Sequence, residues 1–381
     1  IGFGAMAAIG SKAVSAIGSG LKSLTAGAIS AGANFENAMS SVAAISGATG
    51  SDFDRLSEKA KQLGKSTQYT ASETASAMEY MAMAGWKTED MLNGIEGVMD
   101  LAAASGEDLA GVSDIVTDAM TAFGLSADGT TKIIKDGFTK EVSNASHFAD
   151  VLAAASANSN TNVAMLGESF KYAAPVAGSL GYSVEDTAIA LGLMASSGLK
   201  SSMAGSSLRT ILTNLAKPTD DISDAMDYLG ISLQNGDGSM KSLMDIVTDL
   251  RGAFGQCKMP MDQFQENLAK LDEKYANGEL TEKKYNEALA DLTEKAYGAE
   301  GALKAKYAAT LAGKEGMSGL LSIVSAAPED FDKLTNAIYN SDGAAKEMAE
   351  IKMDNLQHDV VKLQSAMEGL GITAFNQVGG K

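Results

Sequence analysis

The sequence has few of the residues that build disulfides, metal centres and aromatic binding sites. Its 381 residues include one cysteine, two histidines, four prolines and one tryptophan, and aromatic residues make up 6%. The single cysteine, Cys257, excludes an intrachain disulfide and a cysteine-based metal framework. Two histidines, His147 in an expected polar loop and His358 on an expected helix, cannot form a His-rich site. We interpret both as solvated side chains and expect no metal and no cofactor.

Basic residues are also in the minority. Lysine and arginine total 30 against 48 aspartates and glutamates, which gives a net charge of −18. Phosphate contacts need clustered basic side chains, so this balance argues against a general nucleic-acid-binding surface. Counting acids does not exclude the carboxylate pair of a glycoside hydrolase. The acids cluster at expected helix starts and exposed faces, however, where capping and solubility account for them. We therefore expect no enzyme activity, no catalytic residues and no specific nucleic-acid binding.

Small and flexible apolar residues are abundant. The chain has 40 glycines and 20 methionines, and hydrophobic residues make up 45% of it. Ala, Met and Leu favour helices, and few segments alternate in the manner of strands. The fold class expected is therefore all-α, a multi-helix globular bundle. The methionines lie on apolar stripes, where filling a core is the first interpretation and an adaptable partner surface is the alternative.

The stretch 69–108 has the clearest helix signals of the chain. Thr70 and Glu73 have the spacing of a capping box, in which each side chain accepts a hydrogen bond from the other's backbone. The helix that they start is followed by a second one over 88–105, which opens with acids in its first turn. The only tryptophan, Trp86, lies at the corner between them. This pattern predicts a compact pair of helices built from small residues.

The same pattern returns 113 positions later. Seven residues of the first stretch recur in identical form: Tyr69, Thr74, Ala75, Ala77, Met81, Ala82 and Gly85 become Tyr182, Thr187, Ala188, Ala190, Met194, Ala195 and Gly198. The capping pair recurs as Ser183 with Asp186, and Phe35 maps onto Phe148. We expect an internal duplication in a core over 34–255, with related halves at about 35–145 and 148–255. Two copies are too few for a solenoid.

The segments outside this core have different characters. Residues 1–33 hold Lys12 and Lys22 and no acid, and their apolar residues fall near one helical face. We interpret them as a Gly/Ala-rich amphipathic helix that packs on its own domain or on sister subunits; the alternative is a membrane-active segment. Its uncharged runs are too short to span a bilayer, which takes about 20 residues. Because the first residue is isoleucine, we expect a fragment or a processed product.

Residues 256–312 combine mixed charges with coiled-coil spacing. The apolar positions step by four and three in two runs: Phe264, Leu268, Leu271 and Tyr275, then Tyr285, Leu289, Leu292 and Ala296. We predict an inserted antiparallel helical hairpin whose tip projects from the body. Residues 313–381 are expected to supply the C-terminal helices of the core, with a helix start at Pro328 and one long helix from Ala344 to Leu370.

Two connecting segments are predicted to be irregular. Residues 127–142 have no clear period, and the letters VSNASH that follow Glu141 indicate a polar loop. Asn235-Gly236-Asp237-Gly238 is typical of a turn and lacks the spaced acids and final glutamate of a calcium-binding EF-hand loop.

The stretch AMEYMAMAGWKTEDMLNGIEGVMDLAAASGEDL resembles the core region of phage tail tape measure proteins. So do ATGSDFDRLSEKAKQLGKSTQYTASE before it and SDIVTDAMTAFGL after it. HFADVLAAASANSNTNV, GESFKYAAPVAGSLGYSVEDTAIALGLMASSG and GSSLRTILTNLAKPT are similar to later parts of the same family, in the same order. The resemblance runs from about Phe35 to about Leu370 and is interrupted by the expected hairpin.

This resemblance implies a structural tail protein that occupies the tube lumen, sets tail length during assembly and takes part in genome ejection. It implies tail tube subunits, tail assembly chaperones and tail-tip proteins as partners. It also implies a homo-oligomer located in the virion, and in the host cytoplasm during assembly, with membrane contact at ejection. The alternative is an ejection-stage membrane-perturbing or cell-wall-degrading module of the same tail protein.

Overall fold

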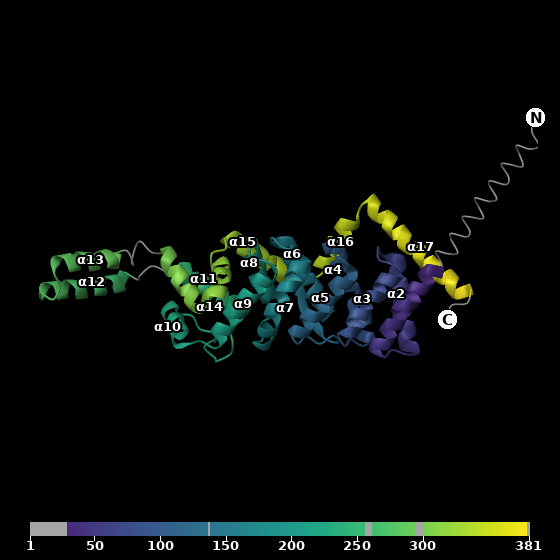
Figure 1. Cartoon of the computed structure of the whole chain (residues 1–381), viewed down its shortest axis with the longest axis horizontal. Helices are drawn as coiled ribbons and strands as arrows, with labels where there is room; N and C mark the ends of the chain where they lie inside the picture. Colours follow the sequence, from purple (N-terminus) through teal and green to yellow (C-terminus); the bar gives the residue numbers. More distant parts are fainter. Residues whose placement is uncertain (1–28, 136–137, 256–260, 294–299, 379–381) are drawn as a thin grey trace, which may run out of the picture. The chain divides into compact units, whose positions relative to one another are not determined.

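The computed structural model describes residues 29–135, 138–255, 261–293 and 300–378 (Figure 1). Helices dominate these residues, and the strands among them form one small two-stranded sheet. The predicted all-α, multi-helix fold is thereby confirmed. Most of the expected N-terminal amphipathic segment lies outside the described residues; its last part belongs to a helix over 29–46. The described chain forms two compact units.

Unit 1 contains the described residues up to Ala154, Asn162–Gly167 and the described residues from Asn340 onward. After the helix over 29–46 its elements are α2 (Ser51–Ser66), α3 (Ala71–Met83), α4 (Thr88–Ser105), α5 (Leu109–Ala122), β1 (Thr130–Lys135), β2 (Phe138–Ser143), most of α6 (Asn144–Asn158), α16 (Ala344–Met353) and α17 (Leu356–Val378). Large side chains such as Met81, Ile95 and Leu101 are fully buried among these helices. Met39, Leu56, Met120 and Phe148 are fully buried as well, so the core of unit 1 is shared by the helix over 29–46 and by α2 to α6.

Local sequence accounts for the helix ends in unit 1. The Thr70 hydroxyl accepts a 3.1 Å hydrogen bond from the backbone N–H of Glu73, whose carboxylate accepts a 2.8 Å bond from the N–H of Thr70. This is the predicted capping box at the start of α3. At the other end of the pair, Gly106 terminates α4 with a φ of 77°, a left-handed conformation that glycine adopts without steric cost. Trp86 is buried at the corner between α3 and α4.

The segment 127–142 was wrongly predicted to be irregular. Strands β1 and β2 pair in antiparallel fashion, with Thr130 opposite Ser143 and Ile133 opposite Lys140. The polar letters VSNASH are not a loop either, because β2 runs to Ser143 and α6 starts at Asn144. The Asn144 side chain accepts a 2.9 Å hydrogen bond from the Thr131 hydroxyl and thereby ties the start of α6 to the hairpin.

Unit 2 contains Ala155–Thr161 and the described residues of Glu168–Tyr339. Its elements are most of α7 (Val163–Ser179), α8 (Val184–Ser196), α9 (Ser201–Ala216), α10 (Asp220–Leu229), α11 (Leu243–Gly255), α12 (Met261–Ala276), α13 (Glu282–Thr293), α14 (Glu300–Val324) and α15 (Pro328–Tyr339). Helix α14 packs closely on α9, where a Cβ atom added to Gly319 would collide with the side chain of Ser207. Pro328 begins α15, as predicted.

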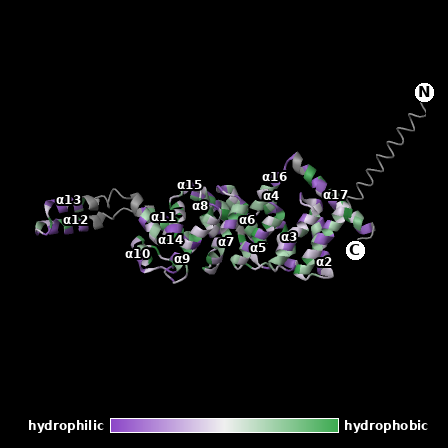
Figure 2. Ribbon diagram, in the orientation of Figure 1, coloured by the Kyte–Doolittle hydropathy of each residue, from purple (hydrophilic) through white to green (hydrophobic). Residues whose placement is uncertain are grey.

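Helices α12 and α13 pair with each other as the predicted antiparallel hairpin. The rings of Tyr275 and Tyr285 lie 4.7 Å apart between centroids, and the Tyr285 hydroxyl donates a 2.6 Å hydrogen bond to Asp272. Hydrophilic residues predominate on both helices (Figure 2). Leu268, Leu271 and Leu289 on the facing stripes are only half-buried, so the two helices alone do not enclose a dry core.

The 113-residue shift seen in the sequence also relates the helices of the two units. Adding 113 to the bounds of α3 gives the bounds of α8, and adding 113 to the start of α4 gives the start of α9. The equivalent glycines Gly85 and Gly198 have φ values of 87° and 91°. Backbone N–H groups just after them return to Met81 and Met194 over 3.0 and 2.9 Å. The length and the termination of α3 therefore recur in α8, whereas α4 and α9 share only their starting position.

The long helix expected from Ala344 to Leu370 is wrong. The chain forms α16 and α17 with a break at Asp354, whose φ and ψ are −79° and 66°. The side chain of the next residue, Asn355, donates a 2.8 Å hydrogen bond to the carbonyl of Lys352 at the end of α16. Asp and Asn compete for backbone groups in this way, and they favour turns and caps over helix interiors.

Candidate functional site

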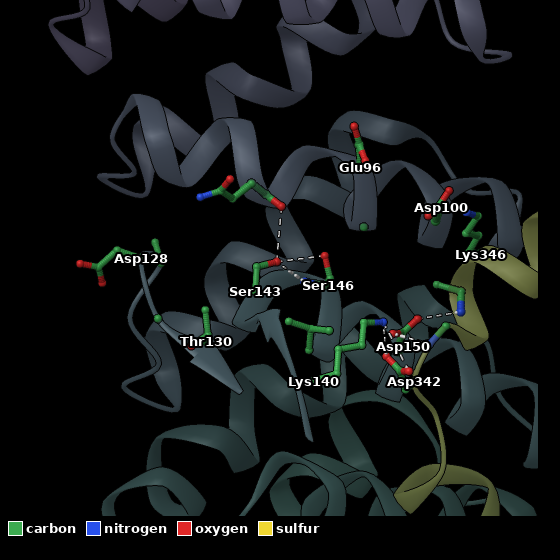
Figure 3. A pocket seen from close by; sticks show the side chains of 17 residues that line it. Glu96, Asp100, Asp128, Thr130, Lys140, Ser143, Ser146, Asp150, Asp342 and Lys346 are labelled. Carbon is green, nitrogen blue, oxygen red and sulfur yellow. Dashed lines mark hydrogen bonds and ion pairs between the residues drawn. The ribbon is translucent and has the colours of Figure 1, made fainter. Parts of the chain in front are cut away.

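Unit 1 contains an acidic groove of about 550 Å³ (Figure 3). Helix α4, the segment that leads into β1, strand β2, helix α6 and the start of α16 all contribute to its walls. The charged side chains that line it are Glu96, Asp100, Asp128, Lys140, Asp150, Asp342 and Lys346. Five carboxylates against two amines make the groove a place of excess negative charge.

Asp150 is the structural centre of the acidic groove. Its carboxylate is buried and accepts hydrogen bonds of 2.9 Å from the backbone N–H groups of Gly343 and Ala345, at the start of α16. Burial raises the pKa of Asp150, while the two amide hydrogen bonds act in the opposite direction without cancelling the effect. The side chain thus satisfies amides that the first turn of any helix leaves without intrahelical partners.

Asp100 on α4 is the second perturbed acid of the groove. Burial raises its pKa to about 6, and the negative charges of Glu96, Asp150 and Glu350 add to the shift. Lys346 on α16 is close enough to oppose it. The group therefore titrates in the weakly acidic range, where an ordinary aspartate is fully ionised.

The remaining polar contacts of the groove hold its walls together. Lys140 on β2 and Asp342 form a 3.1 Å ion pair that joins the hairpin to the segment before α16. The Ser143 hydroxyl donates a 2.9 Å hydrogen bond to the hydroxyl of Ser146. These are structural contacts, and none of them pairs a nucleophile with a base. Across the described residues, no three His, Cys, Asp or Glu side chains lie together as a group able to hold a metal ion.

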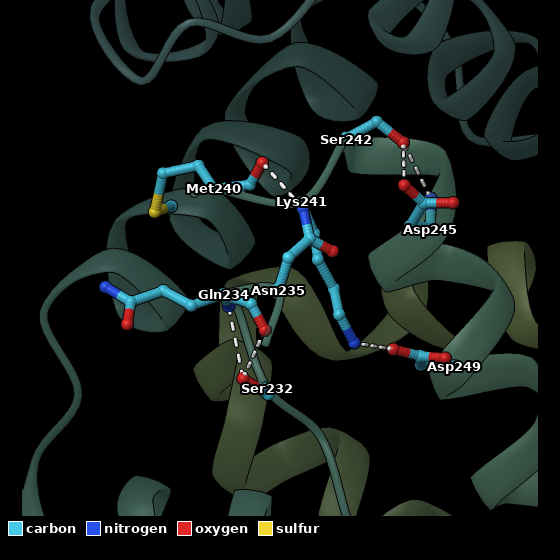
Figure 4. A network of polar contacts seen from close by, with 8 residues as sticks. All are labelled: Ser232, Gln234, Asn235, Met240, Lys241, Ser242, Asp245 and Asp249. Carbon is cyan, nitrogen blue, oxygen red and sulfur yellow. Dashed lines mark hydrogen bonds and ion pairs between the residues drawn. The ribbon is translucent and has the colours of Figure 1, made fainter. Parts of the chain in front are cut away.

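Unit 2 has a separate polar network around the turn at 235–238 (Figure 4). The backbone N–H of Asn235 bonds to the carbonyl of Ser239 over 2.8 Å, and Gly238 has a φ of 85°. Lys241 and Asp249 form a 2.6 Å ion pair, and the lysine side chain is partly buried. The segment thus forms the predicted turn, and its polar groups serve to hold that turn against α11.

Sequence reasoning named no site residues, and it placed the two histidines only as solvated side chains. His147 lies in the first turn of α6 and is half-buried, so its predicted position in an exposed loop is wrong. His358 lies on α17, as expected, and its side chain is outside the described part. Asp150 was missed, although it is a lone acid inside the apolar run HFADVLAAASA. A charge in such a run must find a partner, and that signal was available.

None of the helices in the described part of the chain combines the length and the apolar character needed to cross a bilayer.

A family model described as "Phage-related minor tail protein" matches residues 57–272, which is more than half of the chain. The chain belongs to this family. A "Tape measure protein" of Pneumococcus phage Dp-1 is 35% identical over 368 residues, which cover 97% of this chain and 27% of that relative. A "Probable tape measure protein" of Escherichia phage P2 is 25% identical over 323 residues, which cover 84% of this chain and 33% of the relative.

These matches confirm the resemblance found in the sequence and indicate a structural role in the phage tail. The chain spans about a quarter to a third of the length of the two curated relatives. No solved structure gives a significant match.

Proposed function

We propose that these residues form the folded, globular region of a tape measure protein that occupies the lumen of the phage tail tube. The family match and the two relatives support this assignment of the chain to the tail. The full protein would set tail length during assembly in the host cytoplasm and remain in the virion. Tail tube subunits, tail assembly chaperones and tail-tip proteins would be its partners, and it would act as a homo-oligomer.

The part of the protein that measures length lies, in this proposal, outside the described residues. The observation that carries this is a hydrogen bond of 2.7 Å in unit 1 from the Ser365 hydroxyl to the carbonyl of Gln68, 297 positions earlier. A helix rises about 1.5 Å per residue, so a continuous helical ruler would hold these two residues roughly 450 Å apart. A region whose ends return to each other in this way adds very little to a ruler.

Deletion in the phage or prophage that encodes the chain tests this proposal. Removing α9 and α10, residues 201–229, takes away the buried side chains of Leu208, Ile211 and Ile222. We expect loss of assembled tails, because unit 2 loses its core. A ruler would instead give tails shortened by about 45 Å, at 1.5 Å per residue. The conservative variant Ile222→Val keeps the core and should give normal tails. Graded shortening in electron micrographs would contradict the proposal.

The acidity of the chain supports a proposed role in genome ejection. A protein with a net charge of −18 offers DNA few counter-charges and should not retain the genome as both pass down one tube. A simpler explanation is that the acidity provides solubility alone. Tight binding of the purified chain to duplex DNA at physiological salt would overturn the ejection role and leave the assembly role untouched. Membrane contact at ejection is a further part of the proposal.

A further inference from the structure

Helix α17 carries two opposite faces, and only one of them is used by unit 1. On the used face Ser365 and Ile372 are buried, and Ser365 bonds to Gln68 as described above. Glu368 accepts a 2.7 Å hydrogen bond from the hydroxyl of Ser72, which lies in the first turn of α3. These contacts fix α17 on the bodies of α2 and α3 without involving its other side.

The other face is a row of exposed apolar side chains. Leu363 is 62% exposed and Leu370 is 68% exposed, and Val360 and Met367 are also exposed. Leu363 precedes the buried Ser365 by two positions, and Leu370 precedes the buried Ile372 by two. Two residues turn a helix by about 200°, so the exposed row points away from the docked face.

The spacing of this row is that of a coiled coil. Val360, Leu363, Met367, Leu370 and Ala374 follow one another at intervals of three, four, three and four, and Leu356 continues the sequence pattern backward by four. This is the a and d repeat of a heptad, with Val360, Met367 and Ala374 at the a positions and leucine at the d positions. A helix packed only on a globular core shows a broader stripe on one side and no second seam opposite it.

The flanks of the row fit a copy of the same chain. The positions that border the row are Asp359, Gln364, Ala366, Gly371 and Thr373, and only Asp359, at its start, is charged. Two chains of net charge −18 repel each other over most of their surfaces. Beyond Asp359, this strip is a place where two copies can meet without placing like charges opposite one another, and a charged partner would find no complementary charge there.

We propose that Val360, Leu363, Met367, Leu370 and Ala374, the α17 seam, pair with the α17 seam of a second copy of this chain. The pairing needs no undocking of α17, because the seam is already exposed. The inference rests on the homo-oligomer included in the proposed function and names the surface that forms it.

Sedimentation velocity of the full 381-residue chain and of two double variants tests the seam. The double variant Leu363→Glu with Leu370→Glu places two charges in the seam. Both residues are exposed, so we expect the variant to fold like the parent. The matched control is Ile351→Glu with Met203→Glu, at residues that are 70% and 62% exposed and lie outside the seam. We expect the parent and the control to sediment as an oligomer at tens of micromolar, and the seam variant as a monomer with unchanged helical content by circular dichroism.

A cross-linking variant keeps the test decisive if the glutamates disturb folding. In a Cys257→Ser background, Leu363→Cys should form an interchain disulfide under mild oxidation, while Ile351→Cys should not. An oligomeric parent with an unaffected seam variant, or equal cross-linking at both cysteines, would overturn the seam and leave the proposed homo-oligomer in place. A monomeric parent would overturn both the seam and the homo-oligomer, and it would leave the assignment to the phage tail unaffected.

Discussion

The carboxylate of Asp150 accepts a 2.9 Å hydrogen bond from the backbone N–H of Ala345, 195 positions further along the chain. Asp150 lies in the apolar part of α6, and Ala345 lies in the first turn of α16. The bond therefore joins the segment from Asn340 onward, which returns to unit 1, to the earlier helix α6. The acidic groove exists because this return leaves Asp342, Lys346 and Asp150 facing α4 and β2.

Asp150→Ala should lower the free energy of unfolding by about 2–3 kcal/mol, because a buried and a partly buried amide at the start of α16 lose their acceptor. Asp150→Asn keeps one carbonyl oxygen and should cost less. The control is Asp342→Asn, which breaks an ion pair to a largely exposed lysine and should cost at most about 1 kcal/mol. Urea denaturation followed by circular dichroism measures all three. Equal losses for Asp150→Ala and Asp342→Asn would contradict the capping role.

The raised pKa of Asp100 predicts that unit 1 is more stable in weak acid than at neutral pH. Its folded pKa, about 6, lies above the ordinary value of 3.8. The stabilising contribution of Asp100 to the free energy of unfolding is therefore fully present below about pH 4 and is lost as the pH rises through 6. Melting temperatures at pH 5 and pH 7.5 check this. Asp100→Asn should raise the melting temperature at pH 7.5 and reduce the difference between the two pH values. If the variant keeps the parent's pH dependence, another group is responsible.

Removing either of the two equivalent caps, Thr70 and Ser183, should lower the free energy of unfolding by a similar amount. Removing the acids three positions later, Glu73 and Asp186, should not. Thr70→Ala and Ser183→Ala each remove one hydroxyl cap and should cost about 1 kcal/mol. Glu73 bonds back to its own cap, but Asp186 accepts the buried N–H of Met244 over 3.2 Å instead. Asp186→Ala should therefore cost more than Glu73→Ala, by about 1–3 kcal/mol for the unsatisfied amide. Chemical denaturation of the four variants measures these losses. A larger loss for Glu73→Ala than for Asp186→Ala would contradict the prediction.

Removing the hairpin should leave the rest of the chain folded, whereas charging the core should not. We predict that replacing residues 261–293 with a short Gly-Ser linker preserves the remaining helical content and a cooperative melt, because the described apolar residues of the hairpin contribute little buried surface. Met81→Asp places an unpaired charge at a fully buried position and should cost several kcal/mol. Met81→Leu serves as its control. If the linker variant were unfolded while Met81→Asp melted like the parent, the hairpin and not the helices around Met81 would be the part that stabilises the chain.

Sequence reasoning was most successful where a structure depends on neighbours in the chain. The capping box of Thr70 and Glu73 and the start of α15 at Pro328 follow from local chemistry, and the structure contains both. The proposed duplication stays a prediction, although α3 and α8 have equivalent bounds. The β1–β2 hairpin was missed because Ile133 and Ile134 are adjacent and obscure a two-residue period. The sequence Asp136-Gly137 between the strands is nevertheless a pair typical of hairpin turns.

Features that depend on distant residues could not be predicted in this way. The apolar residues of 344–370 suggest one continuous stripe, but which face of α17 is buried depends on distant residues, since Gln68 and Ser72 bind Ser365 and Glu368 on its other side. Those residues hold α17 by its polar and small side chains, which leaves Leu363 and Leu370 outward. Likewise nothing near Asp150 in the sequence reveals that its partners are the amides of Gly343 and Ala345.

The most direct test of the central claim is the length of tails assembled with the hairpin deleted. The claim is that this region is a folded part of the tape measure protein and not its ruler. Phage that carry the linker in place of residues 261–293 should build tails of unchanged length, measured by electron microscopy on a large number of particles. A mean length shorter by about 50 Å, the rise of 33 helical residues, would contradict the account.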